Sequence, residues 1–248
     1  MDSATIRRSV VDGTFADDLR LAVQPIVELD SSRPSGAEAF IRWQTDVGVV
    51  PPVAWLPIAA ETGRLVDAVA AVRSDLVAAS AALSGTDLGL SVNVTGAMIV
   101  EPGCRELLDG LGAAMSCPLA VELHVAEFVC LSTQRLPWAT APVGALVDAC
   151  ADVRSNDVRL WLDDLDAVAV DDPAWASVAW DVVKLDRSVL VGGALAAVAT
   201  TVRATHAGPV VVEAVESEAQ VAAASAAGCT HAQGFFYGAP QPVQRPAS

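Results

Sequence analysis

The sequence is poor in positive charge, in aromatic residues and in long apolar runs. Of its 248 residues, 15 are Lys or Arg and 30 are Asp or Glu, which gives a formal net charge of −15. Proteins bind duplex nucleic acid through Lys and Arg that displace counterions, so this charge argues against a duplex partner. A small anionic ligand is still compatible with it, because metal ions held by carboxylates neutralise phosphates locally.

Signals for export and membrane insertion are also missing. The N-terminus has no basic segment followed by an apolar one. The uncharged stretch 188–202 contains two adjacent glycines and is shorter than the roughly 20 residues that a membrane span needs. We therefore expect a cytoplasmic protein without a membrane partner.

Sequence signatures of several common chemistries are absent. There is no Gly-x-Ser-x-Gly elbow and no phosphate loop of the Gly-x-x-x-x-Gly-Lys type. The cysteines form no C-x-x-C pair and their number is odd, which favours buried, reduced thiols. The cysteines are Cys104, Cys117, Cys130, Cys150 and Cys229.

Short apolar runs of β type alternate with longer helical patterns along the chain. This alternation predicts an α/β fold, a (β/α)8 TIM-like barrel forming a single domain over residues 1–248. Only a few residues separate the first two runs, too few for a parallel crossover, so one strand is expected to be antiparallel. The expected strands are 21–29, 36–43, 88–94, 119–125, 158–164, 180–186, 209–215 and 231–237.

Three further features complete the expected fold. Residues 1–18 read as a polar lead-in with one helix. Apolar residues at helical spacing over 65–83 predict one long amphipathic helix. The proline-containing tail 241–248 is expected to trail on the surface.

Acidic or amide side chains lie at the ends of several predicted strands. In a parallel barrel these ends meet at one rim, and a hard cation needs oxygen ligands that converge from several elements. A helix N-cap or a surface salt bridge would explain any single one of them, although caps are served equally well by Ser or Thr. The residues are Glu38, Asn93, Glu122, Asp163, Asp164 and Glu213.

Two of these features carry the most specific chemistry. Adjacent carboxylates such as Asp163 and Asp164 can bridge two cations, although a solvated acidic turn is the alternative. Lys184 lies inside an apolar strand, where a lysine is rarely buried unless paired. It could hold or deprotonate a water near a metal, or simply form a salt bridge with Asp186 or Asp164. Three histidines without metal-ligand spacing are expected to be structural: His124, His206 and His231.

A series of motifs in a fixed order covers most of the chain. They are Gln24-Pro-Ile, Glu38-Ala-Phe with Arg42-Trp43, Pro57-Ile-Ala-Ala-Glu-Thr-Gly63, Ser91-Val-Asn93, Glu122, Asp163-Asp164, Val183-Lys184-Leu-Asp186, Glu213-Ala-Val-Glu216 and Gln233-Gly-Phe-Phe. This series resembles the EAL domain, the cyclic-di-GMP phosphodiesterase family, from about residue 5 to 242.

The resemblance implies a two-metal site for Mg2+ or Mn2+ in a TIM-like barrel that opens cyclic di-GMP to the linear dinucleotide pGpG. Lys184 would orient the attacking water, with Glu38 and Glu213 as further catalytic residues. A homodimer and a regulatory protein partner are also consistent with the resemblance. The first metal would be held by Glu38, Asn93, Glu122 and Asp163, and the second by Asp163, Asp164 and Glu213. The ligand-binding set would be Gln24, Arg42, Asp186, Glu216 and Gln233.

Three departures from the family pattern bear on activity. Phe40 replaces the signature leucine, Val125 replaces a second glutamate, and Asp166 and Val168 replace loop glycines. We therefore expect the loop 165–173 to be mobile or differently folded and the second metal site to be weak. Two hypotheses follow: a metal-dependent phosphodiesterase, or a receptor or protein-interaction module that hydrolyses slowly or not at all.

Overall fold

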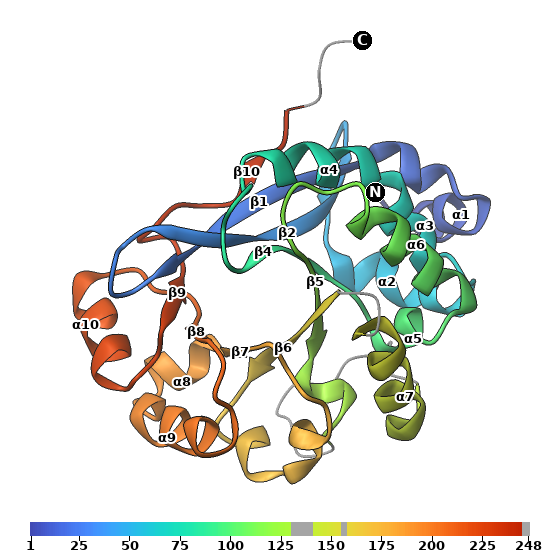
Figure 1. Ribbon diagram of the computed structural model, residues 1–248. Coiled ribbons are helices and arrows are strands. Elements are labelled where there is room, and N and C mark those ends of the chain that lie inside the picture. The colour runs from blue at the N-terminus through green and yellow to red at the C-terminus, as the bar shows by residue number, and fades with distance from the viewer. Residues whose placement is uncertain (130–140, 155–157, 245–248) are drawn as a thin grey trace.

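The computed structural model describes residues 1–129, 141–154 and 158–244. Within them, eight strands close a barrel, and helices surround it (Figure 1). The TIM-like fold is confirmed, and the expected strands are present with shifted ends. The barrel strands are β1 (Leu19–Glu28), β2 (Pro34–Thr45), β4 (Gly89–Asn93), β5 (Leu119–His124), β6 (Arg159–Leu165), β7 (Val182–Leu185), β8 (Val210–Val212) and β9 (His231–Gln233).

Strand β1 runs against the rest of the barrel, as the short first connection predicts. It pairs antiparallel with β2 and with β9, whereas β2 and β4 to β9 pair parallel in sequence order. The register places Gln24 opposite Glu38 and Ile26 opposite Gln233. The antiparallel strand therefore closes the barrel between its first and last parallel strands.

Two short strands lie outside the closed barrel. β3 (Gly48–Val50) pairs with the end of β2, and β10 (Gln241–Pro242) pairs with β1. Residues 241–242 lie on the surface as expected, but their backbone pairs with β1 instead of trailing away from the sheet. Residues 245–248 lie outside the described part of the chain.

The predicted helix over 65–83 is two helices. α3 (Leu65–Ala71) ends and α4 (Arg73–Ala81) begins around Val72, whose φ of −101° and ψ of 10° interrupt the helical path. The apolar spacing survives the break, because Val72 is itself buried. The helix expected before β1 is α1 (Ser3–Asp12).

The other helices cover the outside of the barrel and short 3-10 turns lie in its connections. The α-helices are α2 (Pro52–Glu61), α5 (Gly96–Ile99), α6 (Pro102–Gly112), α7 (Val143–Arg154), α8 (Arg187–Val191), α9 (Leu195–Thr205) and α10 (Glu218–Ala226). The 3-10 turns are η1 (Thr14–Asp18), η2 (Val125–Glu127), η3 (Ala169–Asp171) and η4 (Pro173–Ser177).

The apolar residues form two clusters on opposite sides of the barrel wall. The larger lies between the strands and the helices, and a small one fills the barrel interior. The interior cluster consists of Ile26, Leu88, Ala120, Trp161, Val182 and Val211. Side chains alternate between the two faces of a strand. The residue two positions after an interior residue therefore also points into the barrel and belongs to the next layer.

The helices and the cysteines of the described residues bear on two expectations from the sequence. None of the helices in residues 1–129, 141–154 and 158–244 is both long and apolar enough to cross a bilayer. The thiols of Cys104, Cys117, Cys150 and Cys229 are buried and free, as expected, and Cys130 lies outside the described residues.

Candidate functional site

The polar site is the second layer of the barrel interior. Val211 is followed two residues later by Glu213, Trp161 by Asp163, and Ala120 by Glu122. Because side chains alternate along a strand, each of these carboxylates lies one layer above an apolar residue of the barrel interior. Neighbouring strands are in register, with Asn93 opposite Glu122, so these layers meet at one level. The expectation of convergence at the rim is correct for this set.

Lys184 lies at the centre of the carboxylates. Its Nζ is 2.9 Å from Glu38 Oε2, 2.7 Å from Glu122 Oε2, 2.9 Å from Asp163 Oδ1 and 2.7 Å from Glu213 Oε1. The side chain is fully buried, and it is the only lysine in the chain. The predicted pairing of a buried lysine with acids is thus found, but with partners from four other strands or strand ends rather than with Asp186 or Asp164.

Amide and hydroxyl groups fix the two innermost glutamates. Asn93 Nδ2 donates to Glu38 Oε1 at 2.7 Å, and Gln233 Nε2 donates to Glu38 Oε2 at 2.9 Å. Gln233 also donates to Gln24 Oε1 at 3.1 Å. Ser91 Oγ donates to the other oxygen of Glu122. Each carboxylate is therefore oriented by hydrogen bonds as well as by charge.

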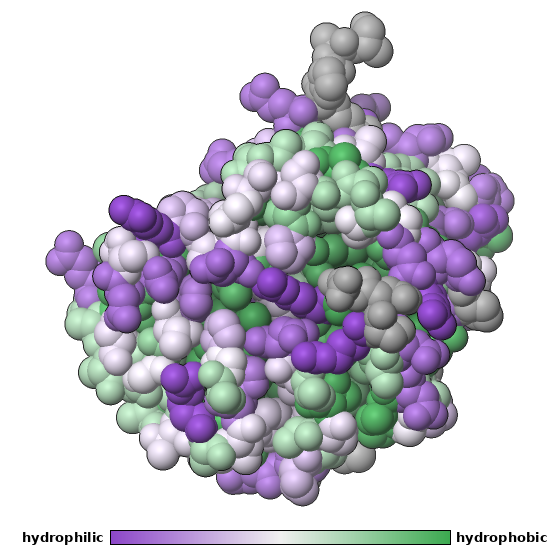
Figure 2. Space-filling model, in the orientation of Figure 1, coloured by the Kyte–Doolittle hydropathy of each residue, from purple (hydrophilic) through white to green (hydrophobic). Residues whose placement is uncertain are grey.

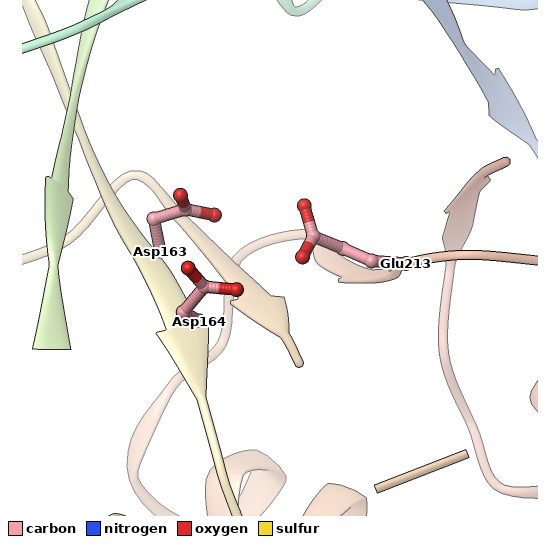
Figure 3. Close-up of side chains that lie close together, drawn as sticks. All are labelled: Asp163, Asp164 and Glu213. Carbon is pink, nitrogen blue, oxygen red and sulfur yellow. The ribbon is translucent and has the colours of Figure 1, made fainter. Parts of the chain in front are cut away.

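Asp163, Asp164 and Glu213 form a second grouping at the mouth. One oxygen from each lies within 4.8 Å of the others, and the three carboxylates face one space (Figure 3). Adjacent strand residues normally point to opposite faces. Here the β6–β7 pairing shifts between Leu162 and Leu165, and Asp164 adopts a left-handed φ of 58°. This irregularity turns both aspartates toward the cavity.

The cluster carries more negative charge than Lys184 can balance. Burial, with the neighbouring Asp163 and Glu213, raises the pKa of Asp164 to about 10. Burial also raises the pKa of Glu213 to about 8, against the opposing effect of Lys184. For Lys184, burial lowers the pKa but the carboxylates outweigh it, so its pKa stays well above the ordinary value. Without another cation, the outer carboxylates therefore hold protons at neutral pH.

The donor set fits hard divalent cations. All the charged donors are carboxylate oxygens, which Mg2+ and Mn2+ prefer. Asp163 Oδ1 is buried and lies 2.9 Å from Lys184 Nζ, yet outside hydrogen-bonding geometry, so it accepts no hydrogen bond. The ammonium of Lys184 is the cation paired with this oxygen, and the negative charge that Lys184 leaves unbalanced favours a further, divalent cation.

A cavity of about 550 Å3 opens above the cluster, and every residue predicted for the site except Lys184 lines it. Strongly hydrophilic side chains cross the centre of this face among hydrophobic ones (Figure 2). Arg42 is half-buried with its guanidinium 4.8 Å from the Phe40 ring centre, and Glu216 is exposed. Asp186 is buried and accepts the backbone N–H of Ser188 at 2.8 Å, so it also caps α8.

His124 is a site residue that sequence reasoning missed. It lines the cavity, and its Nε2 is 3.3 Å from Asp164 Oδ2. The signal was available, because His124 follows Glu122 by two residues and so points to the same face of β5. The structural role expected for the other two histidines agrees with their contacts: His206 Nε2 lies 3.1 Å from the carbonyl oxygen of Pro209, and His231 contacts Thr230 and Ser35.

The loop after Asp164 has a defined conformation built by its own substitutions. Asp166 is buried, and its Oδ1 accepts the N–H groups of Val168 at 2.9 Å and Ala169 at 2.6 Å. Neither Asp166 nor Val168 has a positive φ. Val125 is fully buried against the core. The loop therefore follows a path that needs no glycine at these positions.

Replacing Asp166 by Gly is expected to destabilise the protein by about 1 kcal/mol, the usual cost of a lost cap. Its oxygen accepts two backbone N–H groups, of which that of Ala169 is buried and would be left without this partner. The melting temperature should fall by about 2–4 °C. Asp166→Asn retains the acceptor and is the matched control. A melting temperature of Asp166→Gly equal to that of the control would contradict the capping role.

Sequence comparison matches residues 7–240 to the EAL domain. A curated relative, an uncharacterized signaling protein of Caulobacter vibrioides, is 24% identical over 96% of this chain. The chain spans only 29% of that relative's length.

Solved structures give the same fold. An EAL domain protein from Listeria monocytogenes superposes with a TM-score of 0.76 at 18% identity, over 98% of this chain and 94% of that one. The FimX EAL domain from Pseudomonas aeruginosa, bound to c-di-GMP, gives 0.75 at 19% identity over 97% of both chains. The PaMucR phosphodiesterase, solved as a c-di-GMP complex, gives 0.76 at 20% identity over 98% of both.

Proposed function

The chain belongs to the EAL domain family, and from this premise we propose that it hydrolyses cyclic di-GMP to the linear dinucleotide pGpG with Mg2+ or Mn2+. The observation that carries the proposal is the layer of five carboxylates with one buried lysine at the floor of a cavity. Glu38, Asn93, Glu122 and Asp163 would hold one cation, and Asp163, Asp164 and Glu213 a second. Bound there, the cations would supply Lewis-acid polarisation of the phosphodiester and of water.

The residues of this chain position the reactants. Water adds to phosphorus, the bond from phosphorus to the ribose 3′ oxygen breaks, and the proton of the water ends on that oxygen. Lys184 has three N–H groups and four carboxylate neighbours. It donates hydrogen bonds to two of these neighbours, Glu38 and Glu122, so its third N–H would hold the attacking water once Asp163 and Glu213 turn toward a cation. Glu38 and Glu213 both contact Lys184 and line the cavity, and either could accept the proton of the water.

The ligand-contacting set belongs to the same proposal. The half-buried Arg42, supported by Phe40, would donate to a phosphate of the dinucleotide. Asp186 and Glu216 line the same cavity and would accept from the base and ribose hydrogens, while Gln24 and Gln233 support Glu38. We also propose, from the family alone, a cytoplasmic domain over residues 1–248 that works as a homodimer or with a regulatory protein partner.

The purified protein is expected to convert cyclic di-GMP to pGpG in Mg2+ or Mn2+, and EDTA should abolish the conversion. Chromatography of the nucleotides measures the product. Because Lys184 is the only lysine, protein labelled at lysine Cε gives one side-chain NMR signal, which Mn2+ at the site should broaden. Tight ligand binding without product after long incubation would contradict hydrolysis and support a receptor.

The protein in EDTA is expected to lose stability as the pH rises from 6 to 9. Asp164 and Glu213 have folded pKa values of about 10 and about 8, well above unfolded values near 4. Their protons stabilise the fold at low pH, and this contribution is lost as the pH rises toward those values, at most about 1.4 kcal/mol per pH unit for each proton.

Bound Mn2+ should remove this pH dependence, since the cation replaces the protons. Melting temperatures at pH 6 and pH 9, each in EDTA and in Mn2+, test the prediction. Residues far from the site titrate equally in both solutions, so the difference isolates the cluster. Glu213→Gln removes one titrating group and should flatten the EDTA curve. Parallel curves in EDTA and Mn2+ would show that the cluster does not bind the cation.

A receptor that binds cyclic di-GMP without rapid hydrolysis is the second candidate. The buried Val125 and the self-capped Asp166 favour it, because the loop beside the outer carboxylates lacks the family's glutamate and glycines. The two functions separate in one comparison: binding titrated in Ca2+, and product formed in Mn2+. Binding in Ca2+ together with no turnover in Mn2+ selects the receptor.

A further inference from the structure

His124 lies beside the carboxylates proposed to hold the outer cation, and its contacts give each of its two ring nitrogens a different role. It is the last residue of β5, and the register of β5 with β6 places it opposite Asp163. Its ring therefore reaches the next residue, Asp164, across the mouth of the barrel. The Nε2–Oδ2 distance is 3.3 Å, which is within the range of an ion pair.

The backbone assigns the tautomer of His124. The N–H of Ala126 donates to Nδ1 at 3.0 Å, so Nδ1 carries a lone pair and the proton of the neutral ring is on Nε2. Coordination of a cation by Nε2 would require the proton on Nδ1, where it would meet the Ala126 N–H. The ring is therefore suited to donate to Asp164 and not to bind a metal directly.

Asp164 depends on this contact more than its neighbours do. Lys184 holds Asp163 and Glu213 at 2.9 and 2.7 Å, but its contacts do not include Asp164. Among the described residues, His124 is the side chain recorded within ion-pair distance of the Asp164 carboxylate. Asp164 lies where the β6–β7 pairing shifts, and its φ is left-handed. Regular strand pairing therefore does not fix the direction of its side chain.

We infer that His124 is a positioning residue for the outer cation, with its Nε2–H fixing the Asp164 carboxylate toward Asp163 and Glu213 while the ring itself stays uncoordinated. The inference rests on the proposed function, because it assumes that this cluster binds a divalent cation. Groups that orient metal ligands in this way typically change metal affinity about 10–100-fold when they are removed.

Two substitutions separate the contacts of the ring. Asn at position 124 places its side-chain oxygen where Nδ1 lies, so it can accept the Ala126 N–H but cannot reach Asp164. Gln at position 124 extends its amide to the region of Nε2 and can donate to Asp164. His124→Asn therefore removes the proposed contact and keeps the local turn, and His124→Gln is the matched control that keeps the contact.

Mn2+ binding to metal-free protein is measured by the EPR signal of free Mn2+, without substrate, and melting temperatures in EDTA confirm folding. We expect His124→Asn to weaken one Mn2+ site about 10–100-fold and His124→Gln to stay within about threefold of the unsubstituted protein. Equal affinity in His124→Asn and the unsubstituted protein would overturn the inference, as would equal weakening in both variants. An unsubstituted protein that binds no Mn2+ would instead overturn the proposed function, and this inference with it.

Discussion

Asp163→Asn is expected to lower Mn2+-dependent opening of cyclic di-GMP by at least about 1000-fold while leaving the fold intact. Asp163 is shared by both proposed cation sites, and Asn preserves its volume but removes its charge. A loss of about 4 kcal/mol of transition-state stabilisation, within the range of metal-ion catalysis, corresponds to this factor. Glu38→Gln removes a carboxylate of the inner site and should behave alike.

Stability separates loss of chemistry from loss of fold in these variants. Because the cluster holds excess negative charge, Asp163→Asn should melt in EDTA no lower than the unsubstituted protein. Asp30→Asn makes the same chemical change at an exposed position in the β1–β2 turn and is the matched control. Turnover is measured as product formed at saturating Mn2+. A rate for Asp163→Asn within tenfold of that control would exclude Asp163 from the cation sites.

Lys184→Met is expected to cost about 3–5 kcal/mol of folding stability in EDTA, the usual range for removing one partner of a buried ion pair. The substitution leaves four carboxylates facing one another without their shared cation. For a chain of this size, the melting temperature should fall by about 6–20 °C.

Other positive charges at the site should rescue Lys184→Met. Mn2+ can occupy the cluster, and protons at pH 6 can neutralise it, so both should raise the melting temperature more in the variant than in the unsubstituted protein. Arg105→Met is the matched control, because Arg105 is exposed and 4.0 Å from Asp109 on the same helix. An exposed pair of this kind contributes about 0–1 kcal/mol. Equal melting temperatures for the two variants would contradict the central role of Lys184.

The sequence alone predicts the barrel and which side chains converge at the candidate site. Alternating β runs and helical patterns predict the strands, and the short first connection predicts that β1 is antiparallel. Strand alternation also predicts which acids point into the barrel, because Glu213 and Asp163 each follow an apolar interior residue, Val211 or Trp161, by two positions. These are local properties, with a period of two residues, and each can be read within one strand.

Two departures from expectation are decided by tertiary packing. The apolar spacing over 65–83 is the same for one helix or two, and the break at Val72 depends on how α3 and α4 fit against the barrel. The pairing of residues 241–242 with β1 depends on a free edge that exists only once the chain has folded. Neither feature has a signal in the nearby sequence.

The arrangement of charges within the site is decided by the tertiary structure. Lys184 lies among four carboxylates because strands distant in sequence are brought to one level by the register of the closed barrel. Asp164 faces Asp163 and Glu213 because the β6–β7 pairing shifts, and His124 reaches Asp164 because β5 and β6 are neighbours. A sequence specifies which side chains point inward along each strand. The distances between side chains on different strands are set by strand pairing, which involves the whole chain.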